Sequence, residues 1–256
     1  MSDMVGFGDF ISWQGGCMLI GRAVAVTPMH AHYAIQIAFG FDQGIRFRTD
    51  DREAWTSYDA VVIPSRQPHT MDATAVRNNA VIFVEPETPE GRALAERFGA
   101  GGIAPVSTAS LAGTDAALFA TWQTHRNAGV TADAASEIVR LLTGVVRPSE
   151  VSDERIIRAI AFIRSHLDRS LTLDEVAEEA CLSPSRFRHL FVEQTGTAFR
   201  PYVLWRRFLL AWEIIIDGQS LSTAAHAAGF ADAAHLTRTS HRMFGFAPSA
   251  LQFTGR

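Results

Sequence analysis

Apolar residues in the first third of the chain fall in short runs that are separated by turn-forming residues. The runs are Met18–Ile20, Ala34–Phe39, Val61–Ile63 and Val81–Val84, and the separators are Gly15-Gly16, Gly40, Asp50-Asp51 and Pro64. Short apolar runs bounded by glycine, proline and aspartate are typical of β-strands. Their spacing of about ten residues predicts a β-barrel or a β-sandwich.

After Pro86 the apolar residues recur at helical intervals. They predict helices over Pro89–Phe98, Thr114–His125 and Thr131–Val145, which can pack on the barrel or on a second subunit. Arg147–Glu150 is polar and contains a proline, which is typical of a domain boundary. We therefore predict an α+β protein with one domain over residues 1–147 and a helical domain over 148–256.

The second domain reads as helical throughout. Ile156, Ile160, Ile163 and Leu167 repeat on one face of a helix that ends near Asp168. A longer helix is predicted over Phe199–Asp217, roughly 28 Å in length at 1.5 Å per residue.

Composition and charge set limits on the class of protein. With 47% hydrophobic and 20% charged residues, the chain has the make-up of a folded globular protein. No apolar run reaches the about 18 residues of a membrane span, no secretion signal is recognisable, and two cysteines fit a reducing cytoplasm. The net charge of −4 argues against nucleic acid at first sight. However, five arginines and a single acid lie between Arg186 and Arg207, and a local basic face can bind a polyanion.

Two segments of the second domain share one plan of helix, turn and helix. In the first, a helix from Leu173 leads to a turn, where Ser183 is a good N-cap and Pro184 suits the first helical position. In the second, Gly229 suits the left-handed backbone that ends a helix, and Asp232 caps the next one. The predicted helix between the segments is close in length to the about 34 Å that separates successive major grooves on one face of DNA.

Residues from about Ser152 to Gln252 resemble the DNA-binding domain of the AraC/XylS family of transcription regulators. The resemblance rests on Leu182-Ser183-Pro184-Ser185-Arg186-Phe187, Phe191 with Gly196, Gly229-Phe230-Ala231-Asp232, His235 with Arg238, and Phe244-Gly245-Phe246-Ala247-Pro248. It implies a double-stranded DNA partner, bound through two helix-turn-helix motifs, and a role in transcription regulation rather than catalysis.

The resemblance also implies which side chains contact DNA. Base contacts would come from Ser185, Arg188 and His189 in the first motif, and from Ala233, Ala234, Thr237 and Arg238 in the second. Arg188 and Arg238 are the strongest candidates, because arginine most often reads guanine. Arg186, Thr197 and Arg206 would contact phosphates.

Four residues depart from the family pattern in this domain. Ala233 and Ala234 replace larger polar residues, so the second motif is expected to read fewer bases. Ser240 replaces a usual core phenylalanine, which predicts looser packing there, and Cys181 stands where glycine is frequent.

The first domain resembles the cupin-type sensor barrel that family relatives carry. His30-Ala31-His32 with Gln36, and later His69, match the positions of the metal ligands of the two cupin motifs. Residues i and i+2 of a strand point to the same face, so His30 and His32 would converge with His69 on zinc, nickel or iron. Gln36 is an amide where the pattern has glutamate, and an amide is a poor ligand. The same histidines can instead line a metal-free effector pocket, or serve only structure.

Two functions follow from these observations. The first is a cytoplasmic regulator that a small molecule or metal controls, and that forms a homodimer through the helices between Thr114 and Val145. As an activator it would also contact RNA polymerase. The alternative is a cupin metalloenzyme with an attached DNA-binding domain, because three imidazoles with an open coordination position support oxygen or hydrolytic chemistry. No nucleophile motif, phosphate loop or paired carboxylates accompany the histidines.

Overall fold

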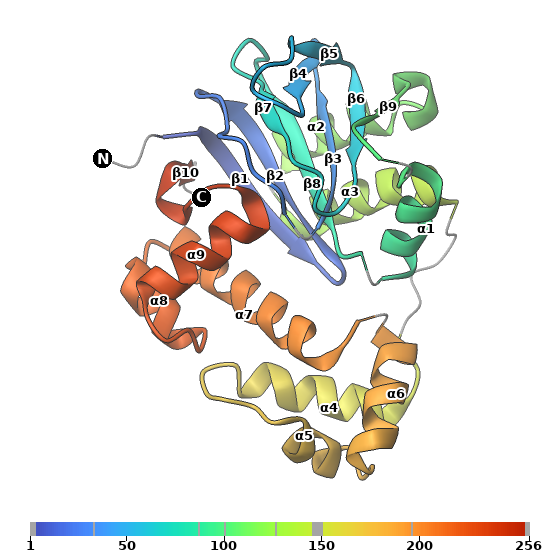
Figure 1. The fold of residues 1–256 in the computed structure, drawn as a ribbon, viewed down its shortest axis with the longest axis vertical. Coiled ribbons are helices and arrows are strands. Elements are labelled where there is room, and N and C mark those ends of the chain that lie inside the picture. The colour runs from blue at the N-terminus through green and yellow to red at the C-terminus, as the bar shows by residue number, and fades with distance from the viewer. Residues whose placement is uncertain are drawn as a thin grey trace. The chain divides into compact units, whose positions relative to one another are not determined.

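The protein consists of two compact units, which we describe from a computed structural model (Figure 1). The structure describes residues 4–32, 34–86, 88–99, 101–125, 127–144, 151–195 and 197–253. Unit 1 contains the described parts of residues 1–86, 90–146 and 240–256, and unit 2 those of 87–89 and 147–239. The predicted boundary at Arg147–Glu150 lies outside the described residues.

Unit 1 is built on two β-sheets. The larger has the strand order β10-β1-β2-β8-β3-β6-β9, and the smaller has the order β5-β4-β7. The strands are β1 (Gly6–Trp13), β2 (Gly16–Ala23), β3 (Ile35–Gly40), β4 (Ile45–Arg48), β5 (Thr56–Tyr58), β6 (Ala60–Ile63), β7 (Thr70–Asp72), β8 (Asn79–Val84), β9 (Ala104–Val106) and β10 (Leu251–Phe253). Three of the predicted runs fall within β2, β6 and β8, and the fourth, Ala34–Phe39, begins one residue before β3. The described strands form two separate sheets and no closed barrel, because each sheet has two unpaired edges.

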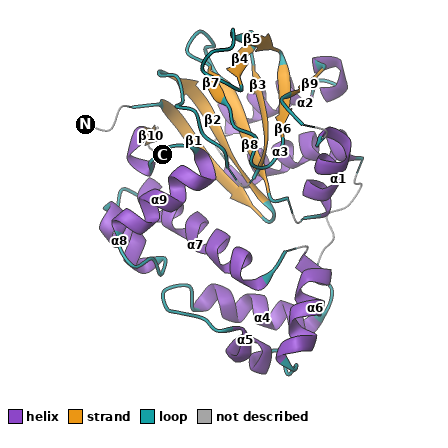
Figure 2. Ribbon diagram, in the orientation of Figure 1, coloured by secondary structure: helices purple, strands orange, loops and turns teal. Residues whose placement is uncertain are grey.

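Alternation along the strands gives the larger sheet two different faces. Ile37 and Phe39 of β3 and Ile82 of β8 belong to the hydrophobic core that the helices complete. These helices are α1 (Pro89–Phe98), α2 (Thr114–His125) and α3 (Ala128–Thr143), with a short 3-10 turn at Thr108–Leu111. In Figure 2 they flank the sheet. The other face carries Gln36, Val81 and Phe83, because side chains two apart on a strand share a face.

The first two helices of unit 1 agree with the pattern prediction, and the third begins earlier. The Asn127 side chain accepts hydrogen bonds from the backbone of Gly129 and Val130, which starts α3 at Ala128. The helix ends before Gly144, which has the left-handed φ of 70°. The predicted start at Thr131 was wrong, because the spacing of apolar residues does not reveal a polar capping residue such as Asn127.

The segment after α9 packs in unit 1. Strand β10 pairs in parallel with β1, with Leu251 opposite Gly6, and the Val5 N–H donates to the Ala250 carbonyl at 2.7 Å. A 3-10 turn at Pro248–Ala250 leads into the strand. The predicted second domain, 148–256, therefore differs at its C-terminal end from the compact unit, which stops at Thr239.

Unit 2 is helical. Its elements are α4 (Glu154–Ser165), α5 (Leu173–Glu179), α6 (Pro184–Thr195), α7 (Phe199–Ile216), α8 (Leu221–Ala227) and the first part of α9 (Ala233–Phe244). Ile156, Ile163 and Leu167 are buried together with Phe187 and Phe191, while Ile160 is partly buried. The apolar face of the first helix is thereby confirmed for Ile156, Ile160 and Ile163, whereas the predicted end near Asp168 was wrong, because α4 ends at Ser165 and Leu167 packs from the turn that follows. No helix among the described residues has the length and apolar character needed to cross a membrane.

Candidate functional site

The first helix pair, α5 and α6, presents a row of polar side chains to solvent. The Ser183 hydroxyl accepts a hydrogen bond from the Arg186 N–H at 3.3 Å, so the predicted cap is present. Phe187 is buried against Phe191, with ring centroids 5.2 Å apart. The helix therefore turns its opposite side outward, where the exposed side chains are Ser185, Arg186, Arg188 and His189.

The second helix pair, α8 and α9, offers a smaller polar surface. The Asp232 carboxylate accepts a hydrogen bond from the His235 N–H at 2.6 Å and caps α9. Arg238 is exposed, whereas the Thr237 hydroxyl donates to the Ala233 carbonyl at 2.8 Å. Ala234 is exposed and carries no hydrogen-bonding group. Of the four residues predicted to contact bases from this helix pair, Arg238 therefore offers the strongest hydrogen-bond donor, its exposed guanidinium group.

Two of the three residues predicted to contact phosphates, Thr197 and Arg206, have little exposed surface. Thr197 is 3% exposed, and its N–H donates to the Thr195 hydroxyl, so its side chain does not reach the surface. The sequence could not indicate this, because Thr197 follows a turn of α6 where polar residues are usually exposed. Arg206 is half-buried, and its Nε is buried without a hydrogen-bond partner.

A different arginine of α7 ties the helices of unit 2 together. The Arg207 Nε donates to the Leu167 carbonyl at 3.0 Å, and another guanidinium nitrogen donates to the Arg169 carbonyl. Burial lowers the pKa of Arg207, although the nearby Asp168 opposes this. Arg207 therefore holds the chain that follows α4 against α7, and its guanidinium group is used in these hydrogen bonds.

In unit 1, the three predicted histidines come together. The ring nitrogens of His30, His32 and His69 that can bind a metal all lie within 4.8 Å of one another. His30 and His69 face each other across a short antiparallel bridge, in which each N–H donates to the other residue's carbonyl. His32 and His69 are buried, and His30 is half-buried.

Backbone carbonyls fix the same tautomer in all three rings. Nδ1 of His30 lies 2.8 Å from the Pro28 carbonyl, that of His32 lies 2.7 Å from the Ala34 carbonyl, and that of His69 lies 3.0 Å from the Gln67 carbonyl. A carbonyl only accepts, so each Nδ1 carries the proton and donates it. In the neutral ring Nε2 then holds a lone pair, and this is the arrangement typical of histidines that bind metals.

Electrostatics keep these rings uncharged. Burial first, and then the neighbouring His30, lower the pKa of His32 to about 4. Burial and the same neighbours lower the pKa of His69 as well, and burial lowers that of His30. Neutral imidazole is the form that binds a metal ion.

The donor set passes a test of fit for a divalent transition metal. His69 Nε2 is buried without a hydrogen-bond partner, and Gln36 Oε1 lies 2.9 Å from His32 Nε2. Two lone pairs at that distance repel, unless a cation lies beside them or the amide is reversed. In a tetrahedral site, zinc–nitrogen bonds of about 2.0–2.1 Å place the ligating nitrogens about 3.4 Å apart, so nitrogens now within 4.8 Å of one another would approach by up to about 1.4 Å.

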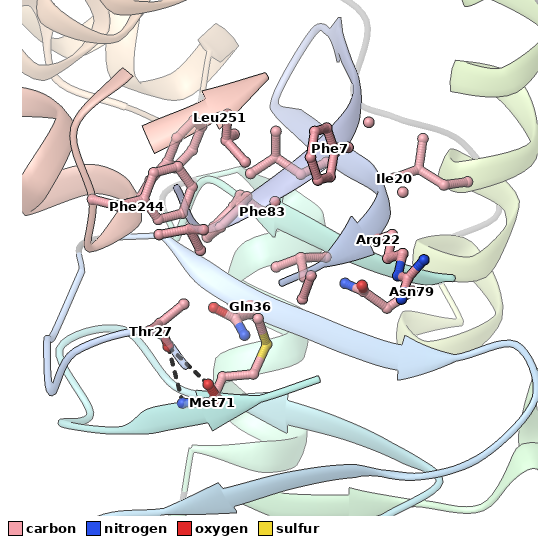
Figure 3. A pocket seen from close by; sticks show the side chains of 18 of the residues that line it. Phe7, Ile20, Arg22, Thr27, Gln36, Met71, Asn79, Phe83, Phe244 and Leu251 are labelled. Atoms are coloured by element: carbon pink, nitrogen blue, oxygen red, sulfur yellow. Dashed lines mark hydrogen bonds between the residues drawn. The ribbon is translucent and has the colours of Figure 1, made fainter. Parts of the chain in front are cut away.

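A largely apolar pocket adjoins the histidines (Figure 3). His30, His69 and Gln36 form part of its wall, together with Phe83 and residues of β1 and β2. Phe244, Phe246 and Leu251 also line it. A Cβ added at Gly245 would lie 2.2 Å from a ring carbon of His30, so only glycine allows this approach. Sequence reasoning missed the contribution of residues 244–251, because they read as the closing motif of the helical domain.

Comparisons with known proteins agree with the helical part of this description. A family model described as a helix-turn-helix domain matches residues 176–252. The probable transcriptional regulator LumQ of Photobacterium leiognathi is 32% identical over 93 residues, which are 36% of this chain and 38% of that protein. The arabinose operon regulatory protein of Escherichia coli (strain K12) is 30% identical over 99 residues, 38% of this chain and 34% of that protein.

A solved structure extends the likeness to the fold of the chain as a whole. ToxT from Vibrio cholerae has a TM-score of 0.51 at 10% identity, over 92% of this chain and 97% of that chain. At this identity the likeness concerns the fold alone, and it agrees with a β-rich first part followed by helices. The chain spans 33% to 44% of the length of the curated relatives it matches. In its C-terminal part, the chain is therefore similar to the helix-turn-helix domains of transcription regulators, among them the arabinose operon regulatory protein.

Proposed function

We propose that this protein regulates transcription by binding a specific DNA site with two helix-turn-helix motifs, the first and the second helix pair. The observation that carries this proposal is the exposed row on α6, in which Arg188 and His189 stand free beside a buried aromatic face. α7 spans 18 residues, or roughly 27 Å, which suits helices that enter successive major grooves.

In this proposal the two motifs read DNA unequally. Ser185, Arg188 and His189 contact base edges, and Arg186 contacts a phosphate. In the second motif Arg238 is the main reader, with Thr237, Ala233 and Ala234 contributing shape and methyl contacts. Arg206 joins the phosphate contacts if its side chain swings outward. The Thr197 side chain is buried, and its phosphate contact stays a prediction.

An electrophoretic shift assay on the DNA upstream of the chain's own gene tests the proposal. We expect a sequence-preferring complex that weakens steeply with salt, because phosphate contacts release counterions. Arg188→Ala should lose discrimination at one base pair by about 1–3 kcal/mol. Arg164→Ala is the matched control, since Arg164 is an exposed arginine of α4. An equal loss of affinity for every sequence would make Arg188 a phosphate contact, and the absence of any preferred sequence would refute the proposal.

We further propose that unit 1 is a cupin-like sensor whose histidine cluster binds a divalent transition metal, namely zinc, nickel or iron. His30, His32 and His69 would supply the imidazole ligands, and Gln36 a weak neutral one. Such an ion would act as a Lewis acid that attracts an effector's oxygen or nitrogen. Two observations favour a metal over purely structural histidines. His69 Nε2 is buried without a hydrogen-bond partner, and backbone carbonyls fix the tautomer of all three rings.

Metal analysis of the purified protein, followed by titration of the chelator-treated protein with Co²⁺, tests the metal proposal. We expect visible absorption bands and one equivalent bound, both lost in His69→Ala. His226→Ala is the control, because His226 is an exposed histidine of α8. Equal cobalt binding by His69→Ala and the parent would refute the assignment of this cluster.

The effector and the assembly complete the proposed function. One ToxT structure with a TM-score of 0.50 is bound to (E)-4-(8-methylnaphthalen-1-yl)but-3-enoic acid, so a protein of this fold takes a small organic molecule. We infer that unit 1 also responds to a small molecule. We infer a homodimer through α2 and α3, since Val130 and Leu141 of α3 are 46% and 38% exposed. If the protein activates transcription, RNA polymerase is a further partner.

A further inference from the structure

The floor of the pocket is a bare stretch of sheet. On β1 and β2, Gly8 pairs with Gly21 and Gly6 pairs with Ala23. Alternation along the strands turns these four positions toward the same face as Phe10 and Leu19, away from the core under the helices. None of the four has a side chain larger than a methyl group, so the sheet leaves a hollow there that side chains would otherwise fill.

A further part of the wall belongs to the C-terminal segment, defined here as residues 244–253. The Phe244 ring stacks on Phe83, with centroids 4.5 Å apart, and also lies 6.1 Å from the Phe10 ring. Leu251 lies beside Gly6 in the β1–β10 pairing. The labelled side chains in Figure 3 show Phe244 and Leu251 on the same side of the pocket as Phe83. A molecule in the hollow would therefore contact both the sheet and the C-terminal segment.

Two buried acceptor atoms line this apolar space without a partner. They are His69 Nε2 and Asn79 Oδ1, and both residues belong to the pocket wall. Asn79 is 7% exposed. A bound metal would satisfy His69, whereas Asn79 needs a hydrogen-bond donor, because leaving a buried carbonyl unpaired is costly. Of the charged residues in the wall, Asp9 accepts a bond from the Trp122 indole at 2.7 Å, and Arg22 is exposed.

The pocket is small. Its cavity volume is about 60 Å³. A water molecule needs about 10–15 Å³ by this measure, so the space accepts about four to six groups of water size. This matches a molecule with a short carbon chain rather than a long acyl chain or a fused ring system.

We propose that the pocket binds a short, uncharged, mostly apolar molecule that donates a hydrogen bond to Asn79 Oδ1, and that the C-terminal segment is part of the binding site. The class is that of small alcohols and primary amides. This inference rests on the proposed regulatory function, for which it names the effector class.

The proposal gives the pocket a direct connection along the chain to the DNA-binding part. α9 runs without a break from Ala233 to Phe244. Its last residue stacks in the pocket, and its first two turns carry Thr237 and Arg238. A ligand that holds Phe244 and Leu251 in place therefore restrains the helix that bears the second set of DNA-contacting side chains.

Two isomeric probes test the ligand class. 1-Butanol and methyl propyl ether have the same atoms, but only the alcohol donates a hydrogen bond. Saturation-transfer NMR on the full chain at millimolar probe concentration should show about tenfold tighter binding of the alcohol, as one net hydrogen bond provides. Asn79→Ala should abolish this preference. Asn78→Ala, a half-buried neighbour outside the pocket wall, should retain it.

Hydrogen exchange of the parent protein tests the wall without any substitution. With 1-butanol bound, amide exchange in peptides covering 244–253 and 5–9 should slow severalfold, and exchange in α4 should not change. Equal binding of the two isomers, or a preference that persists in Asn79→Ala, overturns the proposed ligand class. Binding that leaves the exchange of 244–253 unaltered overturns the role of the C-terminal segment.

A shift assay on the same preparation separates this inference from the proposed function. Sequence-specific DNA binding without any alcohol binding would remove the pocket proposal alone. Alcohol binding to a protein that fails to select a DNA sequence would instead remove the regulatory function and leave the pocket.

Discussion

Replacing Gly229 with alanine should strongly destabilise the second helix pair. Gly229 has a φ of 71°, in the left-handed region that costs residues with a Cβ about 1–2 kcal/mol. A Cβ there would lie only 2.1 Å from the Leu167 carbonyl oxygen, so that carbonyl must move. The same oxygen accepts the Arg207 Nε at 3.0 Å, and losing a hydrogen bond to a charged group costs about 1.5–3 kcal/mol. We therefore expect Gly229→Ala to cost about 3 kcal/mol.

The turn of the first helix pair provides a matched substitution of opposite sign. Cys181 occupies the left-handed region with a φ of 53°, and its side chain is exposed. Cys181→Gly removes the backbone strain but increases the freedom of the unfolded chain by up to about 1 kcal/mol. The two effects nearly cancel, so we expect a change between zero and about 1 kcal/mol of added stability.

Urea unfolding followed by tryptophan fluorescence measures both effects, because Trp205 and Trp212 are buried in unit 2. The Gly229→Ala transition should move to clearly lower urea, and the Cys181→Gly transition should stay or move higher. A Gly229→Ala protein within 0.5 kcal/mol of its parent would refute the steric reasoning, as would a Cys181→Gly protein that loses about 1 kcal/mol or more.

Three further predictions concern unit 1. Burial lowers the pKa of His32 from 6.5 to about 4, so between pH 6.5 and pH 4 His32 takes up a proton in the unfolded chain but not in the folded one. The free energy of unfolding of the protein in chelator should therefore decrease as the pH is lowered, and His32 should account for roughly 3 kcal/mol of that decrease at pH 4. His32→Gln should make denaturant midpoints less pH-dependent, and an unchanged dependence would contradict the pKa. Ser240→Ala should cost about 1 kcal/mol in thermal unfolding, since its buried hydroxyl donates to the Phe246 carbonyl at 2.7 Å; a neutral result would mean that this bond contributes nothing. Leu141→Arg should weaken self-association in analytical ultracentrifugation, and an undisturbed dimer would place the interface elsewhere.

The helices of the molecule could largely be predicted, because their signals are local. Capping residues such as Ser183 and Asp232 lie next to the helices they start, and buried side chains recur at fixed intervals. The strand runs were found where at least three apolar residues adjoin, as in β2, β3, β6 and β8. Strands β4, β5 and β7 were missed because they are three or four residues long and carry polar residues.

The candidate sites differ in the same way, since one depends on short local motifs and the other on segments far apart in the sequence. The histidine cluster could be predicted from the two motifs, and His30, His32 and His69 do come together. The expected strand geometry was wrong, because His30 and His32 lie between β2 and β3, where His30 forms only an isolated bridge with His69. The apolar pocket could not, since its walls are about 240 residues apart in the sequence at β1 and β10. Ser240 illustrates a further limit. We expected loose packing from its small size, but the side chain is fully buried and hydrogen-bonded.

The pairing of β1 with β10 has a consequence for the order of folding during synthesis. Gly6 emerges from the ribosome about 240 residues before its partner Leu251. Translation proceeds at about 5–20 residues per second, so the edge of β1 stays without its neighbouring strand β10 for at least about ten seconds. Until β10 arrives, the bare glycine stretch and the rings of Phe10 and Phe83 are open on that side. Nascent unit 1 should therefore expose an unpaired strand edge. Such an edge can pair with another chain and aggregate unless a chaperone binds it first.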